Sequence, residues 1–149
     1  MKKIIYSPGE PSGIGPDLII KLSSSKLWED LNIPIVSIGD PKLFIDRAAL
    51  LKKKIKIIEL ESLNEVSKNT KGLIQIIKVT KCFNTRPGKL SKSNAQYVLD
   101  NLTYSIKQTM QNEGTALVTG PLSKENIISI DKLFTGHTEY IKKITKSKD

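Results

Sequence analysis

Five short apolar runs set the strongest limit on how this chain can fold. They lie at residues 3–7, 34–38, 55–60, 73–79 and 116–118. Branched and aromatic side chains dominate these runs, and such runs of four to eight residues are typical of strands. Segments with helical spacing separate most of them. Strands that alternate with helices predict an α/β fold, with a largely parallel sheet and flanking helices.

Two helices carry clear start signals near the N-terminal end. Pro16 suits the first turn of a helix that begins after a glycine-rich loop. Asp40 is a good N-cap for a second helix, which begins at Pro41 and is expected to end near Leu51. Three lysines at residues 52–54 then lie at the negative end of the helix dipole, so we interpret them as a solvated helix end.

A third and longer helix is expected over residues 95–111. Ser93 and Gln96 have the spacing of a capping box ahead of it, and Gly114 follows as a stop signal. Its apolar stripe, which includes Met110, predicts packing in the core or in a dimer interface. The polar segment 61–71, which lies between two expected strands, is the best candidate for a mobile loop.

Length and cysteine content bound the class of protein. A chain of 149 residues suffices for one compact domain. No run approaches the roughly 20 apolar residues of a membrane span. Cys82 is the only cysteine, which excludes an internal disulfide and fits a reducing compartment, so we expect a cytoplasmic protein without a membrane partner.

The net charge of +9 raises the question of nucleic-acid binding. Only two of the 24 basic residues, Arg47 and Arg86, are arginines, which alone can bind guanine or phosphate through two parallel hydrogen bonds. The lysines are spread along the chain and accompany 21 isoleucines, an excess that an AT-rich coding sequence would produce. We therefore expect no nucleic-acid partner and keep a lysine-rich nucleic-acid binder as the weakest alternative.

The candidate functional residues gather after the last apolar run. The run ends at Thr119-Gly120-Pro121, a short helix is expected over residues 123–130, and Thr135-Gly136-His137-Thr138-Glu139 follows. Ligands of α/β proteins bind beyond the carboxyl ends of strands, where this segment would lie. The alternative is structural: Thr138 would be the N-cap of another helix and His137 a surface residue.

The loop at residues 8–15 is a second, weaker candidate site. It holds three glycines and two prolines between an expected strand and an expected helix. Unpaired N–H groups at such a helix start could hold an anion or a cofactor phosphate. It matches neither of the common glycine-rich nucleotide motifs, so a tight strand-to-helix connection is an equal alternative.

Four blocks of this sequence resemble signatures of one enzyme family. They are residues 8–17 (PGEPSGIGPD), 87–91 (PGKLS), 119–124 (TGPLSK) and 134–139 (FTGHTE). Together they resemble the 4-hydroxythreonine-4-phosphate dehydrogenase family of vitamin B6 biosynthesis. The resemblance implies a two-domain fold like that of isocitrate and isopropylmalate dehydrogenases, with residues 1–149 as a truncated N-terminal portion without an internal domain boundary.

The same resemblance implies an activity and its requirements. The family oxidises 4-phosphooxy-L-threonine with NAD or NADP, and the product decarboxylates to 3-amino-2-oxopropyl phosphate. It works as a homodimer with a divalent metal (zinc, magnesium or cobalt), held by three histidines of its later portion. His137 and Thr138 match the family's substrate-binding residues. No catalytic, cofactor-binding or metal-binding residue of the family is assigned in this chain, and the role of Lys124 stays open.

Two hypotheses follow for the chain as a whole. In the first, it is the N-terminal part of this dehydrogenase, inactive alone, whose partners are the small phosphorylated amino-acid substrate and the missing C-terminal portion. In the second, it is a non-catalytic remnant of a truncated gene. In either case we expect the isolated chain to be aggregation-prone or loosely packed, since strands of the complete sheet would be missing.

Overall fold

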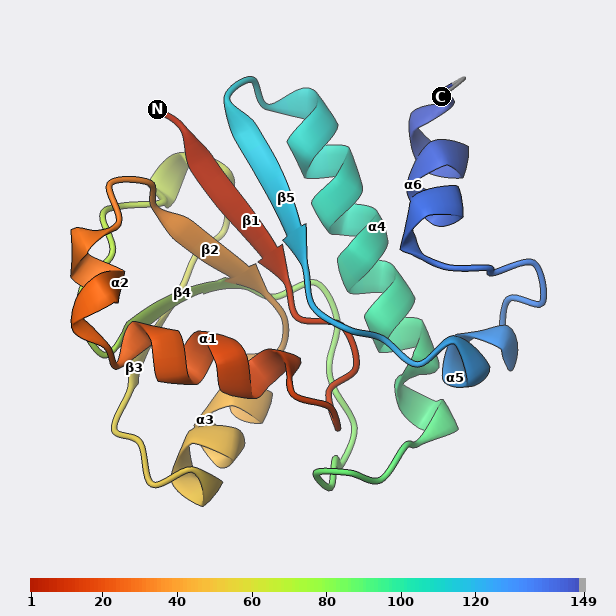
Figure 1. Ribbon diagram of the computed structural model, residues 1–149, viewed down its shortest axis with the longest axis horizontal. Helices are drawn as coiled ribbons and strands as arrows, with labels where there is room; N and C mark the ends of the chain where they lie inside the picture. Colours follow the sequence, from red (N-terminus) through yellow and green to blue (C-terminus); the bar gives the residue numbers. More distant parts are fainter. Residues whose placement is uncertain (148–149) are drawn as a thin grey trace.

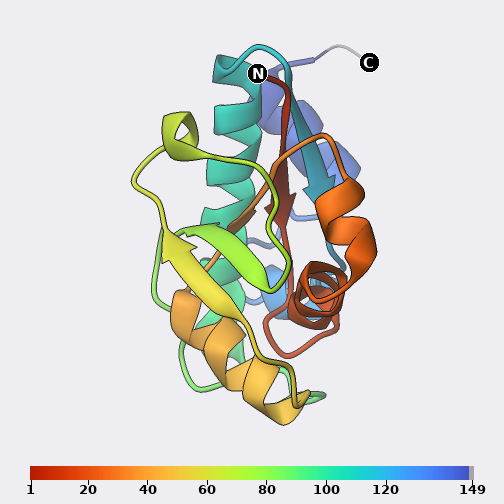
Figure 2. The same ribbon diagram turned by 90° about the vertical axis from the view of Figure 1, so that its left-hand side faces the viewer.

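The computed structural model describes residues 1–147 and consists of a parallel sheet with helices on both faces (Figures 1 and 2). The strands are β1 (Lys3–Ser7), β2 (Ile35–Ile38), β3 (Lys56–Glu59), β4 (Leu73–Ile77) and β5 (Thr115–Thr119). The α-helices are α1 (Gly15–Ser23), α2 (Lys26–Asp30), α3 (Pro41–Leu50), α4 (Ala95–Gln111), α5 (Lys124–Ile128) and α6 (His137–Thr145). Two short 3₁₀ helices are η1 (Leu63–Glu65) and η2 (Lys92–Asn94). No helix within residues 1–147 is long and apolar enough to cross a membrane.

The strand order places β1 between two regions of the chain. The sheet runs β3-β4-β2-β1-β5, and all its pairs are parallel. Ile5 of β1 pairs with Val36 on one side and with Leu117 on the other. After β1 the chain builds β2, β3 and β4 on one side and then crosses to β5 on the opposite side. The order therefore reverses between β1 and β5, so their carboxyl ends form a topological switch point.

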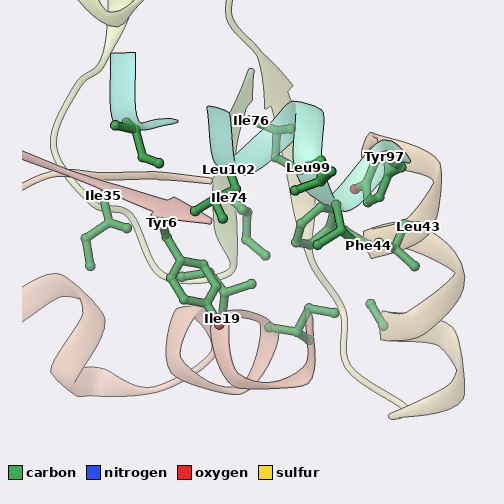
Figure 3. Close-up of a cluster of buried hydrophobic side chains, with 14 of the residues drawn as sticks. Tyr6, Ile19, Ile35, Leu43, Phe44, Ile74, Ile76, Tyr97, Leu99 and Leu102 are labelled. Atoms are coloured by element: carbon green, nitrogen blue, oxygen red, sulfur yellow. The ribbon is translucent and has the colours of Figure 1, made fainter. Parts of the chain in front are cut away.

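Alternate residues of the strands build two cores on the two faces of the sheet. The first core packs α1, α2 and α3 against one face and extends along α4 (Figure 3). Its members from the sheet are Tyr6, Ile35, Ile74 and Ile76, and the helices contribute Ile19, Ile20, Trp28, Leu43, Phe44, Tyr97, Val98, Leu99 and Leu102. In Figure 2 the sheet lies between α4 on one side and α1 and α2 on the other.

The second core covers the other face and anchors the segment that was expected to be mobile. It contains Ile5, Val36, Ile38 and Ile77 of the strands, together with Leu60, Leu63 and Val66. The segment at residues 61–71 thus supplies two apolar side chains to this core, and it contains η1 with a capping box formed by Ser62 and Glu65. Gln75 of β4 also exchanges hydrogen bonds with Ser67. These contacts attach the segment to the sheet.

The predicted fold class and most predicted elements are confirmed. All five expected strands form, and α1 begins one residue before Pro16. Asp40 is the N-cap of α3, where its carboxylate accepts a hydrogen bond from the Lys42 backbone N–H at 3.2 Å. The helix over residues 95–111 has the predicted bounds.

Several local predictions were wrong. Ser93 makes no capping box, because its hydroxyl bonds to Ser91 Oγ at 2.7 Å while Gln96 Nε2 bonds to Asp100. The residues before α4 instead form η2, whose last residue, Asn94, is the N-cap of α4. Met110 is 56 % exposed, so this end of the stripe does not join the core, and packing in a dimer interface stays a prediction for it.

Two further differences concern burial rather than boundaries. Helix α2 was not predicted, because five residues are too few to show a helical period, yet its Trp28 is 1 % exposed. The apolar run at residues 116–118 would suit a buried strand, but Val118 of β5 is 45 % exposed. β5 is an edge strand of the sheet, so its apolar residues lack a neighbour on one side.

Candidate functional site

The candidate site lies where β1 and β5 end. The loop that leaves β1 and the turn that leaves β5 run side by side: Gly120 N–H donates to Ser7 O at 2.8 Å, and Glu10 N–H donates to Pro121 O at 2.9 Å. This is the switch point of the sheet, where ligands of open α/β sheets bind. Two of the sequence blocks noted above therefore meet in one place.

Glycine is required at this junction by close backbone approach. A Cβ on Gly9 would lie 2.2 Å from the Pro121 carbonyl oxygen, and Gly9 has a φ of +80°. A Cβ on Gly120 would lie 2.3 Å from the Pro8 carbonyl oxygen. Any side chain at either position would force the two loops apart.

The guanidinium of Arg47, in α3, holds the loop at residues 8–15 through hydrogen bonds. It donates to Pro11 O at 2.7 Å, to Gly13 O at 2.9 Å and to Asp17 Oδ1 at 2.7 Å. Only 3 % of Arg47 is exposed. The planar guanidinium of arginine can donate several hydrogen bonds at once, which suits these three contacts. Sequence reasoning considered Arg47 only as a possible nucleic-acid contact and missed this structural role.

The same loop leaves little room for a phosphate. A Cβ on Gly15, the first residue of α1, would lie 1.8 Å from Pro8 O, so the loop folds tightly back on itself. Asp17 places a carboxylate in the first turn of α1. This geometry favours the tight strand-to-helix connection over the cofactor-phosphate alternative.

His137 is the first residue of α6 and lies against the turn after β5. The ring faces the Gly120 backbone carbonyl. Desolvation by burial is the main cause that lowers the pKa of His137 below its ordinary value; the Gly120 carbonyl opposes this shift, and the Lys124 ammonium adds to it. A lowered pKa favours the neutral imidazole, which has one donor and one acceptor nitrogen.

The N-terminus of α6 does not have the cap that the structural alternative required. Gly136, not Thr138, is the N-cap, and its φ of 149° favours glycine. Thr138 follows His137 in the first turn, and its side chain is exposed. The two predicted substrate-binding residues thus lie next to each other at one helix start, beside Gly120.

Lys124 and Glu139 complete the surroundings of His137. A Cβ on Gly136 would lie 3.5 Å from Lys124 Nζ and 3.5 Å from Glu139 Oε2. Lys124 is the first residue of α5, and Ser123 caps this helix by accepting from the Asn126 backbone N–H at 3.2 Å. The site therefore offers an ammonium group, a hydroxyl, an acceptor nitrogen and a carboxylate within a short stretch of surface. Such a set suits a small ligand that carries both an anionic group and hydrogen-bond donors.

The residues present do not fit a divalent metal. Among residues 1–147, no group of three or more histidine, cysteine, aspartate or glutamate side chains is placed to hold a metal ion. Zinc sites need three or four such ligands, and His137 has no second histidine near it. We therefore route no chemical step of this chain through a metal.

A hollow lies between the start of α3, the segment after β4 and the segment before α4. Its volume is about 590 Å³, and it is lined by Lys42, Lys81, Cys82, Phe83, Asn84, Ser91 and Ser93. Burial raises the pKa of the Cys82 thiol to about 12, so this cysteine is not a reactive thiolate. The sequence did not single out this hollow, and its residues show no arrangement for catalysis.

Comparison with known proteins places these features in a family context. A family model described as "Pyridoxal phosphate biosynthetic protein PdxA" matches residues 30–149. The 4-hydroxythreonine-4-phosphate dehydrogenase of Citrobacter koseri is 32% identical over 148 residues, which are 99% of this chain and 44% of that protein. The enzyme of the same name from Methylococcus capsulatus is 35% identical over 143 residues, which are 96% of this chain and 42% of that protein. The chain thus spans less than half the length of these curated relatives.

Solved structures agree on the fold. A 4-hydroxythreonine-4-phosphate dehydrogenase from Klebsiella pneumoniae has a TM-score of 0.88 at 24% identity, and the match covers 99% of this chain and 45% of that one. One from Burkholderia phymatum has a TM-score of 0.88 at 20% identity, over 100% of this chain and 45% of that one. At these identities the likeness establishes a shared architecture.

Proposed function

Because this chain belongs to the PdxA family of pyridoxal phosphate biosynthetic proteins, we propose that it forms the substrate-contacting N-terminal portion of a 4-hydroxythreonine-4-phosphate dehydrogenase. The reaction is the oxidation of 4-phosphooxy-L-threonine with NAD or NADP, followed by decarboxylation to 3-amino-2-oxopropyl phosphate. One observation carries the proposal. His137, Thr138 and Lys124 lie together at the switch point between β1 and β5.

Each group can hold a part of such a substrate. The acceptor nitrogen of His137 can accept a hydrogen bond from a substrate hydroxyl or ammonium. The Lys124 ammonium and the Thr138 hydroxyl can donate to a carboxylate or phosphate oxygen. The His137 ring is partly buried against the Gly120 carbonyl, so that the substrate would be oriented by groups already in place.

The oxidation needs more than these residues supply. In the proposed complete enzyme, NAD or NADP would supply a hydride acceptor and a divalent metal (zinc, magnesium or cobalt) would supply a Lewis acid. Among the described residues, no group of three or more side chains is placed to hold a metal ion. We therefore propose that this portion binds and orients the substrate, and that turnover requires residues outside those described. The proposal includes a homodimer and a cytoplasmic location, which sedimentation and cell fractionation would test.

Calorimetry tests binding separately from turnover. The chain should bind 4-phosphooxy-L-threonine, which is also called 4-hydroxythreonine 4-phosphate, with a dissociation constant on the order of millimolar. His137→Ala and Thr138→Ala should each weaken it by about tenfold, since each removes a ligand contact. Thr145→Ala, in the last turn of the same helix, should bind like the wild type. L-Threonine, which lacks the phosphate, should bind more weakly.

Turnover is tested by adding the remaining portion. The chain alone, with NAD or NADP and a divalent metal, should form no NADH or NADPH. Addition of the later portion of a curated relative, produced separately, should allow formation of the reduced cofactor, and His137→Ala should reduce it. Wild-type binding and wild-type turnover in His137→Ala would refute the proposed role of this residue.

A further inference from the structure

We infer that Glu10 is a positioning residue for the His137 site: its buried carboxylate, through Asn126, holds the segment of residues 120–126 on which both His137 and Lys124 depend. The inference rests on the proposed function, since it names the group that keeps the ligand-binding surface in shape. Glu10 itself is covered by other residues and is not proposed to touch the substrate.

Glu10 is an unusual carboxylate for its surroundings. It is 5 % exposed, and no ion pair involving it occurs within residues 1–147. Instead its two oxygens accept three hydrogen bonds: Oε1 from Ser12 N at 3.1 Å and Ser12 Oγ at 2.8 Å, and Oε2 from Asn126 Nδ2 at 3.2 Å. Burying a carboxylate without a cation costs free energy, so these three hydrogen bonds are needed to stabilise the buried Glu10 side chain.

Asn126 connects Glu10 to a third segment, the one that precedes α4. Its side chain is 4 % exposed, and Nδ2 also donates to Ser91 O at 3.0 Å, just ahead of η2 and α4. One carboxylate–amide pair therefore joins the loop after β1, the segment before α4, and α5. These three segments are far apart in sequence, and three of the four signature blocks lie in or next to them.

The joined segment carries the partners of His137. The Gly120 carbonyl and the Lys124 ammonium both influence the pKa of His137, and Lys124 begins the helix in which Asn126 lies. The backbone bond from Glu10 N–H to Pro121 O, at 2.9 Å, fixes one end of this segment. The side-chain bond to Asn126 fixes the other end. Without it, α5 loses its side-chain link to the loop after β1, although Gly120 N–H still donates to Ser7 O and Asn126 Nδ2 still donates to Ser91 O.

The matched test replaces Glu10 by an amide of the same shape. In Glu10→Gln, the new Nε2 faces Asn126 Nδ2, two donors oppose each other, and the link is lost, while the bonds to Ser12 can remain. His137 is the only histidine, so its ring gives a single set of NMR resonances. Its titration reports its surroundings without any ligand.

The direction of the change separates positioning from charge. The charged groups that face His137 are Lys124 and Glu139. Removing the negative charge of Glu10 would, by electrostatics alone, lower the pKa of His137 further. Loss of positioning lets water reach the ring, which removes the largest cause of the lowered pKa, while the displaced Gly120 and Lys124 have opposite effects that offset each other; the pKa of His137 should therefore rise toward its ordinary value. We expect this rise, together with about tenfold weaker binding of 4-hydroxythreonine 4-phosphate.

Two further variants complete the test. Glu125→Gln, which removes an exposed charge next to Lys124, should leave the Gly120–His137 geometry unchanged and bind like the wild type. The double variant Glu10→Gln with Asn126→Asp restores a donor–acceptor pair and should return the His137 titration part of the way to the wild type. If the amide spectrum of Glu10→Gln shows an unfolded chain, Asn126→Ser removes the same link from the other side.

The outcomes distinguish the two proposals. A His137 pKa that stays unchanged or falls in a folded Glu10→Gln or Asn126→Ser, with wild-type ligand binding, would overturn the positioning role. A rise in the His137 pKa in a chain that binds no ligand would support positioning and refute the proposed function. A rise together with weaker binding would support both.

Discussion

β2 and β5 are both short apolar strands of one parallel sheet, yet they differ sharply in burial. All four residues of β2 are buried, whereas residues of β5 alternate between partly buried and exposed. β2 has neighbours on both sides, and β5 has β1 on one side only. Apolar composition therefore predicts that a strand forms, but its place in the sheet determines how much of it is buried.

The helices show the same contrast. α4 has eight buried residues and packs along the sheet, while α6 has none. α6 packs against the first core through Tyr140, Ile141 and Ile144, which are only partly buried. The Tyr140 ring lies 5.4 Å from that of Phe134, and its hydroxyl bonds to Thr103 at 2.8 Å. His137 and Thr138 lie on this less buried side. Ligand-binding segments are commonly drawn from the less stable parts of a fold.

The largest expected effect is on stability, and it distinguishes a residue of the first core from an exposed residue of β5. Phe44→Ala removes a side chain with 0 % exposure from the first core and should lower the free energy of unfolding by about 3–5 kcal/mol. Val118→Ala on β5 should lower it by less than about 1 kcal/mol. Urea unfolding followed by circular dichroism measures both. Equal losses would show that β5 is as well packed as the centre.

Arg47 offers the next largest effect. Arg47→Met keeps the length of the side chain but leaves two loop carbonyls and Asp17 without their donor, so stability should fall by about 3 kcal/mol. Lys42→Met removes only an exposed ion pair with Asp46 and should change stability little. If the two variants are equally stable, the buried guanidinium does not hold the loop.

Hydrogen exchange should show that local stability differs between α6 and β2. Amides of α6 should exchange about 100-fold faster than those of β2, because local opening of α6 exposes little apolar surface. The expectation from sequence that the isolated chain is loosely packed stays a prediction, and this measurement also tests it. Uniformly fast exchange, with dye-accessible apolar surface, would support loose packing throughout. Uniformly slow exchange would contradict the contrast.

The fold could be predicted further from sequence than the site. The strands, the Asp40 cap and α4 follow from local patterns, which act over a few residues. The hydrogen bonds of Glu10, Arg47 and Asn126 join segments distant in sequence, and no local pattern marks them. His137 and Thr138 came from a family resemblance. Gly120 and Lys124 lie in the sequence block at residues 119–124, but only the structure shows that they lie beside His137.

The smallest expected effect is a dependence of stability on pH. The pKa of His137 is lowered in the folded chain, so the unfolded chain binds a proton more readily. The stability that neutral His137 provides is therefore present above about pH 6.5 and is lost as pH falls through that value and then through the lower folded pKa. Urea unfolding at about pH 7.5 and about pH 5.5 should show this loss in the wild type and a smaller one in His137→Gln. An equal loss in both would assign it to other groups.

The most direct test of a ligand site at the switch point is a residue-by-residue NMR titration with 4-hydroxythreonine 4-phosphate. We predict that the amide shifts concentrate at residues 119–124 and 136–138, on the β5 side of the sheet, and that the His137 ring resonances move with the same saturation curve. Inorganic phosphate should perturb the same residues more weakly. Shifts that instead cluster at residues 81–93, around the hollow near Cys82, or no shifts at saturating ligand, would contradict the account.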